Sequence, residues 1–435
     1  MSEKILKQVV RNVSPFQATG RIDSIQGIIT VSMPAAIGDL CEIRGRDGRS
    51  CLAEVIGFSG RQTQIMPFGN SENLQRGDEV VALNQPMTIP VGTGILGRVI
   101  NAVGEPIDNL GPLDFAERVA INGAPPAALS RDEITDVFVS GQKAIDGLLT
   151  LGRGQRVGLF AGSGVGKSTL LGQIARHANA DLNVVVLVGE RGREVVPFVE
   201  HSLGREGMSK SIVIVATANE TALARVRAAE SALAMADWFR SRGKNVLLML
   251  DSLTRFAMAQ RDLGLMLGEP PTARGYTPSV FQKLAVLLER MGNSDRGSIT
   301  GIITILVEGD DMNDPIADSA RSILDGHIVL TRKLANSGHF PAIDVLASNS
   351  RLFLELAEPK HKQAAICIRQ ILARYDDVVD LVQIGAYQKG VSAQTDLALE
   401  LHPMVNQFLQ QELDVPQAFE QTLEKLYSVV ARWTS

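Results

Sequence analysis

The 435-residue chain has few aromatic residues, few cysteines and no excess of positive charge. Aromatic residues make up 5% of the sequence, which disfavours a surface that stacks on nucleic-acid bases. The 43 basic residues are outnumbered by 48 acidic ones, giving a formal net charge of −5, so we expect no nucleic-acid partner. The cysteines Cys41, Cys51 and Cys367 are odd in number and widely spaced. They predict buried free thiols in a reducing compartment rather than a disulfide framework or a zinc site.

Long hydrophobic runs are also missing. The longest apolar runs, such as residues 246–250, have the length of a strand and not of a membrane span. The N-terminus lacks an apolar stretch of signal-peptide length. These features predict a soluble, cytoplasmic protein.

The chain divides into three parts by pattern. Residues 20–85 contain short alternating apolar runs separated by turn signals, which predict a small β-barrel. Strand-like runs at 155–160, 184–188, 211–216, 246–250 and 302–307 alternate with helix-length stretches such as 221–240, which predicts a largely parallel α/β sheet. Helical patterns follow at 362–375, 395–412 and 416–433. We therefore predict an N-terminal segment and barrel at 1–88, an α/β domain at 89–355 and a C-terminal helical domain at 356–435.

A glycine-rich loop between the strand at 155–160 and the next helix matches a phosphate-binding loop. Its glycines let backbone N–H groups face a phosphate, and the helix N-terminus adds a positive dipole. Lys167 is expected to reach the β- and γ-phosphates, and the Ser168 hydroxyl to bind Mg²⁺. Ala161 stands where the strict pattern has glycine, a change that need not bring a methyl group against the phosphates. The predicted nucleotide-binding loop consists of Ala161, Gly162, Ser163, Gly164, Val165, Gly166, Lys167, Ser168 and Thr169.

Two carboxylates follow other strands of the same domain. Asp251 ends the run 245–250, at the edge where α/β sheets bind ligands, and is predicted to hold Mg²⁺ with Ser168. An aspartate after a strand is also a common helix N-cap. Glu190 follows the strand at 184–188 and could orient the attacking water, although pairing with a neighbouring arginine is an equal alternative.

The order of these motifs resembles that of hexameric ATPases related to the catalytic subunit of rotary ATP synthases. Within that group the chain is most similar to the ATPases of type III protein export, especially the flagellar one. The resemblance extends from about residue 18 to about residue 390. The matching runs are GQKAIDGLLT at 141–150, residues 189–195, DSLTR at 251–255, GEPP at 268–271, GYTPSVF at 275–281, EGDD at 308–311, residues 314–330, and the run from PAID at 341–344 through residues 350–351.

The resemblance implies a RecA-like P-loop NTPase core and a role for several residues. Glu190 matches the catalytic carboxylate, and Arg191 an arginine that approaches the γ-phosphate. Arg255 matches a nucleotide-binding position. Arg351 matches the arginine finger that reaches the nucleotide of the neighbouring subunit, although sequence alone would favour a surface salt bridge. Lys167 completes the catalytic set.

The resemblance also implies features outside the phosphate site. Phe340 falls where relatives stack an aromatic ring on adenine, and Tyr387 aligns with a second such ring, although buried packing is the commoner role of an aromatic residue. The loop at 268–281 faces the centre of the ring in relatives. Near-helical apolar spacing marks the N-terminal end, which in relatives binds a stator-like regulatory protein; the alternative is a frayed terminus. The spaced residues are Ile5, Leu6, Val9, Val10 and Val13.

The expected function is Mg²⁺-dependent ATP hydrolysis by a homo-oligomeric ring, a hexamer, that energises or gates protein export. The resemblance implies further partners: a central stalk-like export protein, export chaperones with their substrates, and a membrane export gate. It also implies a cytoplasmic protein that associates peripherally with the export apparatus of the inner membrane. Flagellar export is favoured over an injectisome. Other readings are a rotary synthase catalytic subunit, a non-catalytic nucleotide-binding ring subunit and a ring-shaped RNA translocase. The presence of Glu190 and the acidic balance disfavour the last two.

Overall fold

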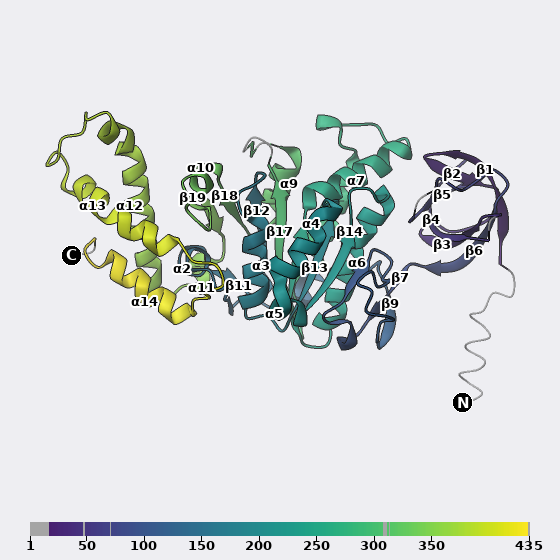
Figure 1. Ribbon diagram of the computed structural model, residues 1–435, viewed down its shortest axis with the longest axis horizontal. Coiled ribbons are helices and arrows are strands. Elements are labelled where there is room, and N and C mark those ends of the chain that lie inside the picture. Colours follow the sequence, from purple (N-terminus) through teal and green to yellow (C-terminus); the bar gives the residue numbers. More distant parts are fainter. Residues whose placement is uncertain (1–16, 47, 70, 308–310, 313, 434–435) are drawn as a thin grey trace.

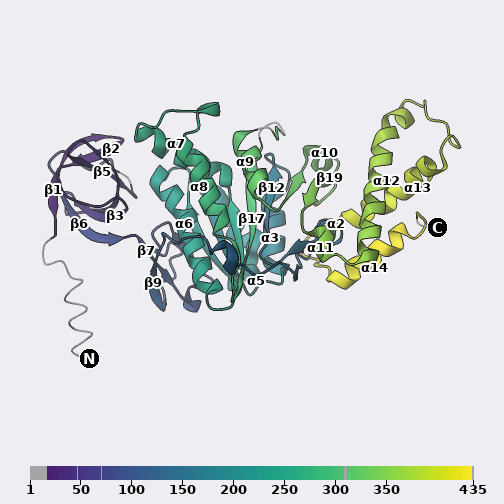
Figure 2. The same cartoon turned by 180° about the vertical axis from the view of Figure 1, so that it is seen from behind.

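A computed structural model describes residues 17–46, 48–69, 71–307, 311–312 and 314–433. The predicted apolar stretch of Ile5 to Val13 and residues 308–310 of the EGDD motif lie outside these ranges. Figures 1 and 2 show a β-barrel, a central α/β body and a group of C-terminal helices in a row along the long axis of the molecule. The predicted fold class is confirmed in all three of its parts.

The N-terminal barrel is closed by six antiparallel strands in the order β1-β2-β5-β4-β3-β6. Alternate residues point inward and fill it with aliphatic side chains such as Ile22, Ile43 and Val55, none more than 1% exposed. Cys41 is fully buried among them as a free thiol. The strands are β1 (Thr19–Gln26), β2 (Ile28–Val31), β3 (Asp39–Arg44), β4 (Ser50–Ser59), β5 (Gln62–Pro67) and β6 (Glu79–Pro86).

The central body is built on a nine-stranded sheet with the path β19-β18-β12-β17-β15-β13-β14-β8, while β16 pairs with β17 off this path. Neighbours from β18 to β8 are parallel, and β19 runs antiparallel to β18. The strands are β8 (Val99–Asn101), β12 (Arg156–Ala161), β13 (Leu182–Val188), β14 (Ser211–Ala216), β15 (Asn245–Asp251), β16 (Gly292–Asn293), β17 (Ser298–Leu306), β18 (Gly326–Leu330) and β19 (Ile343–Ser350). Two short ribbons, β7 (Thr88–Val91) with β9 (Glu117–Ala120) and β10 (Val137–Phe138) with β11 (Leu151–Gly152), flank it.

Helices cover both faces of this sheet. On β13, Val184 and Val186 belong to the apolar cluster that includes α6 and α7, whereas Val185 and Leu187 belong to the cluster that includes α3 and the C-terminal helices. This two-sided burial explains why the strands read as continuous apolar runs. The helices of this body are α2 (Lys143–Leu148), α3 (Lys167–His177), α4 (Gly192–Pro197), α5 (Gly204–Ser209), α6 (Ala222–Arg240), α7 (Leu253–Met266), α8 (Pro278–Glu289), α9 (Pro315–Ile323), α10 (Arg332–Asn336) and α11 (Phe353–Leu356).

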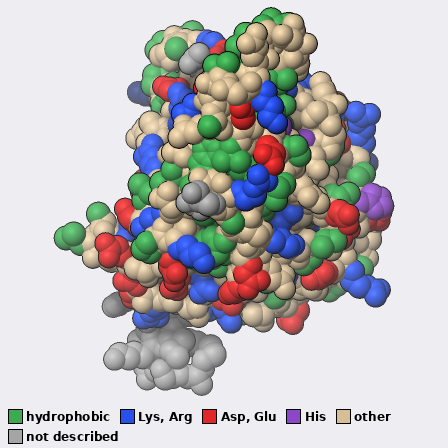
Figure 3. All heavy atoms as spheres, turned by 90° about the vertical axis from the view of Figure 1, so that its left-hand side faces the viewer, with side chains coloured by type: hydrophobic (Ala, Val, Ile, Leu, Met, Phe, Trp, Pro, Cys, Tyr) green, Lys and Arg blue, Asp and Glu red, His purple; other side chains and the backbone are tan. Residues whose placement is uncertain are grey.

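The C-terminal helices are α12 (Pro359–Gln383), α13 (Ala393–Leu409) and α14 (Phe419–Val430). The first is longer than the predicted 362–375, because the acidic residues Asp376, Asp377 and Asp380 interrupt the apolar repeat without ending the helix. None of the described helices is long and apolar enough to cross a bilayer. Figure 3, which views this end of the molecule, shows basic and acidic side chains intermixed over its face.

Candidate nucleotide site

The phosphate loop leaves the end of β12 and turns into α3. Ala161 is the last residue of β12 and is fully buried in the sheet, so its methyl group packs into the core. Gly164 and Gly166 have φ angles of 80° and 87°, a backbone region that favours glycine. Lys167 begins α3, and the Ser168 and Thr169 side chains are exposed beside it. The helix N-terminus is therefore open to an anion, as a phosphate loop requires.

The Lys167 ammonium lies close to both predicted carboxylates, Asp251 and Glu190. It donates a hydrogen bond to Asp251 Oδ1 and lies 3.6 Å from Glu190 Oε1. All three side chains are largely buried. Burial raises the pKa of Glu190, and the charge of Asp251 raises it further, while Lys167 and Arg255 act in the opposite direction. Three residues from separate strand ends thus converge at one edge of the sheet.

The sequence does not predict a functional role for Thr304 on β17. Its buried hydroxyl donates a hydrogen bond of 2.7 Å to Asp251 Oδ1. Because β17 lies between β12 and β15, this hydroxyl can hold the Asp251 carboxylate toward the phosphate loop. A threonine within an apolar strand gives no local signal, so only the tertiary pairing reveals it.

The two arginines predicted near the phosphates are placed differently. Arg255 lies on the first turn of α7 with its stem against Gly189, and its buried Nε has no hydrogen-bond partner among the described residues. Such an unsatisfied donor suits a phosphate. Arg191 instead pairs with Glu194 at 3.3 Å, and its side chain is two-thirds exposed. Its approach to a γ-phosphate stays a prediction.

A mostly apolar cavity of about 250 Å³ adjoins the phosphate loop. Gly166, Thr169 and Phe340 line it, with the Phe340 ring half-exposed and lying beside Gly166. Gln411 and Leu413, from the segment after α13, also line it. The cavity therefore offers an aromatic ring next to the phosphate loop, as the adenine prediction for Phe340 requires. The contribution of the segment after α13 could not be seen in the sequence, because it lies about 240 residues from the loop.

Tyr387 does not line this cavity. It follows α12, and its hydroxyl donates a hydrogen bond of 2.8 Å to Asp396. The structure brings Phe340 to the phosphate loop and leaves Tyr387 in the connection between α12 and α13. Its predicted contact with adenine is untested.

Arg351 lies near the start of strand β12, whereas the phosphate loop lies at the end of that strand. Its backbone N–H donates to Asp325 O, and the Asp325 carboxylate binds Arg156, the first residue of β12. The phosphate loop follows Ala161, the last residue of that strand. At about 3.3 Å per residue the strand alone separates the two by roughly 17 Å. This distance exceeds the reach of an arginine side chain, so Arg351 cannot serve the phosphate loop of its own chain.

The residues at the strand ends fit Mg²⁺. The metal prefers oxygen ligands and commonly takes only one or two carboxylates, with water and substrate phosphates completing its shell. Asp251 and the exposed Ser168 hydroxyl supply such oxygens beside the loop. Within the described ranges no group of three or more His, Cys, Asp or Glu is arranged to hold a metal by itself. These oxygens would hold Mg²⁺ together with the phosphates of a bound nucleotide.

Family models match each part of the chain. The nucleotide-binding domain of the ATP synthase alpha/beta family matches residues 141–350, and the beta-barrel domain of that family matches residues 24–84. The C-terminal domain of the T3SS EscN ATPase matches residues 357–428. The Flagellum-specific ATP synthase of Bacillus subtilis (strain 168) is 46% identical over 433 residues, 99% of each chain. The chain belongs to the family of flagellar and type III secretion ATPases.

Members of both branches of this ATPase family are close in sequence. The Type 3 secretion system ATPase of Xanthomonas euvesicatoria is 44% identical over 98% of this chain and 97% of its own. The structure of the assembled ATPase EscN from the enteropathogenic E. coli type III secretion system matches with a TM-score of 0.89 and 43% identity, over 94% of this chain and 100% of the chain in that structure. The resemblance and the ATPase activity predicted from the sequence are confirmed.

Replacing Thr304 by valine is expected to lower the kcat of this ATPase by about 10- to 100-fold, because a hydrogen bond to a charged group is worth roughly 1.5–3 kcal/mol. Valine keeps the shape of threonine, so the strand should fold as before. The measurement is steady-state phosphate release as a function of Mg²⁺ concentration. Thr304→Ser, which restores the hydroxyl, should recover most of the loss. Equal activity of the valine and serine variants would contradict this role.

Replacing Phe340 by alanine is expected to weaken ATP binding by about 5- to 100-fold, because stacking of a base on an aromatic ring is worth roughly 1–3 kcal/mol. Phe340→Trp should retain binding. The measurement is the dissociation constant of a fluorescent ATP analogue. Tyr387→Ala, tested in parallel, decides whether a second ring contacts adenine: unchanged affinity would remove it from the site.

Proposed function

We propose that this ATPase works as a homo-oligomeric ring, a hexamer, that couples Mg²⁺-ATP hydrolysis to type III protein export. Its action is to release export substrates from their chaperones and unfold them at the export gate, and the system it serves is the flagellum. The observation that supports a ring is the position of Arg351, which lies at the opposite end of the strands from the phosphate loop of its own chain.

The chemistry follows from the convergent residues. Lys167 binds and neutralises the β- and γ-phosphate oxygens and thereby leaves Asp251 and Glu190. Ser168 and Asp251 would hold Mg²⁺, which would neutralise charge on the phosphates. Glu190 orients the attacking water and accepts its hydrogen bond; its raised pKa reflects a carboxylate kept from bulk water. Arg255 directs its unpaired Nε to phosphate oxygens.

The site is completed between subunits. Each phosphate loop receives Arg351 from the neighbouring subunit, which neutralises the charge that develops on the transferred phosphoryl group. Such head-to-tail contacts close into a ring when the rotation between subunits is suitable. The solved relative EscN is described as assembled, and a second structure contains EscN in complex with its central stalk EscO. We extend both features to this chain: a ring, and a stalk-like export protein in its centre, next to the loop at 268–281.

The remaining partners rest on the family alone. They are a stator-like protein at the N-terminal segment, export chaperones with their substrates, and an export gate that the cytoplasmic ring approaches without entering the membrane.

The shared site is tested by the concentration dependence of hydrolysis. Turnover per chain should rise steeply between dilute protein and ring-forming concentrations, as followed by phosphate release with light scattering on the same samples. Turnover per chain that stays constant while the assembly state changes would refute the shared site.

The choice of the flagellum is tested in the source cell. Deleting the gene should abolish swimming and filament assembly, and the intact gene should restore both. A deletion strain that swims normally but fails to secrete injected proteins would assign the chain to an injectisome instead.

A further inference from the structure

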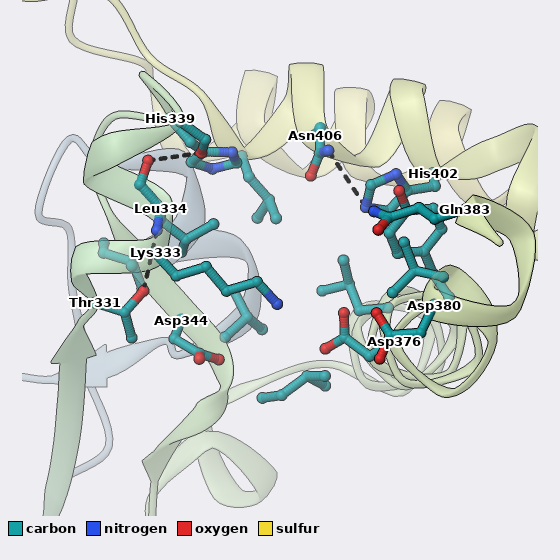
Figure 4. A pocket seen from close by; sticks show the side chains of 18 residues that line it. Thr331, Lys333, Leu334, His339, Asp344, Asp376, Asp380, Gln383, His402 and Asn406 are labelled. Carbon is teal, nitrogen blue, oxygen red and sulfur yellow. Dashed lines mark hydrogen bonds between the residues drawn. The ribbon is translucent and has the colours of Figure 1, made fainter. Parts of the chain in front are cut away.

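A second cavity lies outside the nucleotide site, between the α/β body and the C-terminal helices. It has a volume of about 540 Å³, within the range of small-molecule sites. α10 and β19 form one wall, and α12 and α13 form the other (Figure 4).

The charges in this cavity face one another without pairing. Asp344 on β19 and Asp376 and Asp380 on α12 line it together with Lys333 on α10. In Figure 4 the Lys333 side chain extends into the space from one wall and Asp376 and Asp380 face it from the other. Within the described part of the chain, no ion pair of 4 Å or less joins any of these four side chains. Three aspartates and one lysine give these side chains a formal net charge of −2.

A buried histidine supplies the second observation. His339 is 5% exposed and lines the cavity, and its Nε2 has no hydrogen-bond partner among the described residues. Burial lowers the pKa of His339, so the ring is neutral at pH 7 and adds no positive charge. On the opposite wall the rings of Tyr375 and His402 stack 3.3 Å apart. Buried polar atoms without a hydrogen bond are rare in folded proteins, so His339 Nε2 is available to bond a ligand in the cavity.

We propose that this cavity binds a compact organic cation, a primary ammonium or guanidinium group on a short aliphatic stem. The carboxylates of Asp376 and Asp380 take the cationic head, the apolar side chains of the walls take the stem, and His339 Nε2 takes a second polar group. The same chemistry occurs in a free diamine and in the Arg or Lys side chain of a protein partner.

Binding in this cavity is coupled to binding in the cavity beside the phosphate loop, here called the adenine pocket, because neighbouring residues of the same segments line both. His339 lines the cavity, and the next residue, Phe340, lines the adenine pocket. Leu409 lines the first, and Gln411, whose N–H donates to Phe340 O at 3.0 Å, lines the second. A cation held between α12 and α10 fixes these segments against each other. It therefore tightens ATP binding, by about 5-fold or more on the usual scale of such coupling, and ATP tightens cation binding by the same factor.

Calorimetry on the full-length protein tests the site without any need for hydrolysis, so it can fail or succeed independently of the proposed export function. Putrescine should bind with one site per chain, and the uncharged diol with the same carbon chain should not. Asp376→Asn combined with Asp380→Asn should weaken putrescine binding about 10-fold or more. Asp377→Asn, on the same helix turn but outside the cavity, is the matched control and should bind as the unchanged protein does.

Lys333→Met gives a result that misfolding cannot produce. Removing the cation that competes for the aspartates should strengthen putrescine binding. N-acetyl-arginine amide, titrated in parallel, identifies the source: tighter binding than putrescine indicates a protein side chain, and weaker binding a free diamine. Absence of binding by both cations, equal binding of the diol, or unchanged binding in the Asp376/Asp380 double variant would overturn the proposal.

Discussion

Replacing Glu190 by glutamine is expected to lower the kcat for ATP hydrolysis by about 10²- to 10⁴-fold, the usual contribution of a positioned general base. Glutamine keeps the size of glutamate but cannot accept a proton from the attacking water. ATP affinity should change little, because the substitution leaves the phosphate-binding side chain of Lys167 and its hydrogen bond to Asp251 in place. It removes only the negative charge of Glu190, 3.6 Å from the Lys167 ammonium. The measurements are single-turnover phosphate release and the dissociation constant of a fluorescent ATP analogue.

Glu194→Gln is the matched control for this substitution. Glu194 lies four residues further on, is exposed on α4 and pairs with Arg191, so its loss should leave kcat within a few-fold of the unchanged protein. The comparison also decides between two readings of Glu190. If turnover in the Glu190 variant is as high as in the Glu194 variant, Glu190 is not the base and another group orients the attacking water.

The phosphate site could be predicted from the sequence because its parts lie at strand ends. In a parallel sheet the carboxyl ends of neighbouring strands meet at one edge, so a residue that directly follows an apolar run is placed by the fold class alone. Asp251 and Glu190 follow such runs, Lys167 follows β12 through the phosphate loop, and the three converge at one end of the sheet. The alternative reading of Glu190, a pair with a neighbouring arginine, applies in the structure to Glu194 instead.

The remaining parts of the site depend on contacts between distant segments. Thr304 reaches Asp251 from a different strand, and Leu413 lines the cavity beside the phosphate loop from beyond the last strand. Neither carries a local pattern, because a threonine in a strand and a leucine in a loop are ordinary residues there. The position of Arg351 likewise depends on contacts between distant segments. Its motif was recognised by resemblance, but its separation from the phosphate loop follows only from the pairing of β19 with β18 and of β18 with β12.

Replacing Arg351 by alanine is expected to lower kcat by about 10³- to 10⁵-fold, the range measured for arginine fingers in phosphoryl transfer. Nucleotide binding to the isolated chain should be unchanged, because the side chain lies at the far edge of the sheet and its Nη2 donates to Arg321 O instead. Arg374→Ala, which removes an exposed arginine on α12, is the matched control and should retain full turnover. The measurements are phosphate release at ring-forming concentration and nucleotide affinity in dilute protein.

Mixing two inactive variants then decides whether Arg351 acts between subunits. A Lys167→Ala chain has no working phosphate loop but retains Arg351, whereas an Arg351→Ala chain has the loop without the finger. In randomly mixed rings of equal parts, about a quarter of the interfaces combine an intact loop with an intact arginine from its neighbour. Activity should therefore reappear on mixing, up to about a quarter of that of the unchanged ring where sites act independently. If Arg351 served the loop of its own chain, mixing would restore nothing, and the roughly 17 Å of strand between them would have to be bridged by a rearrangement of the sheet edge.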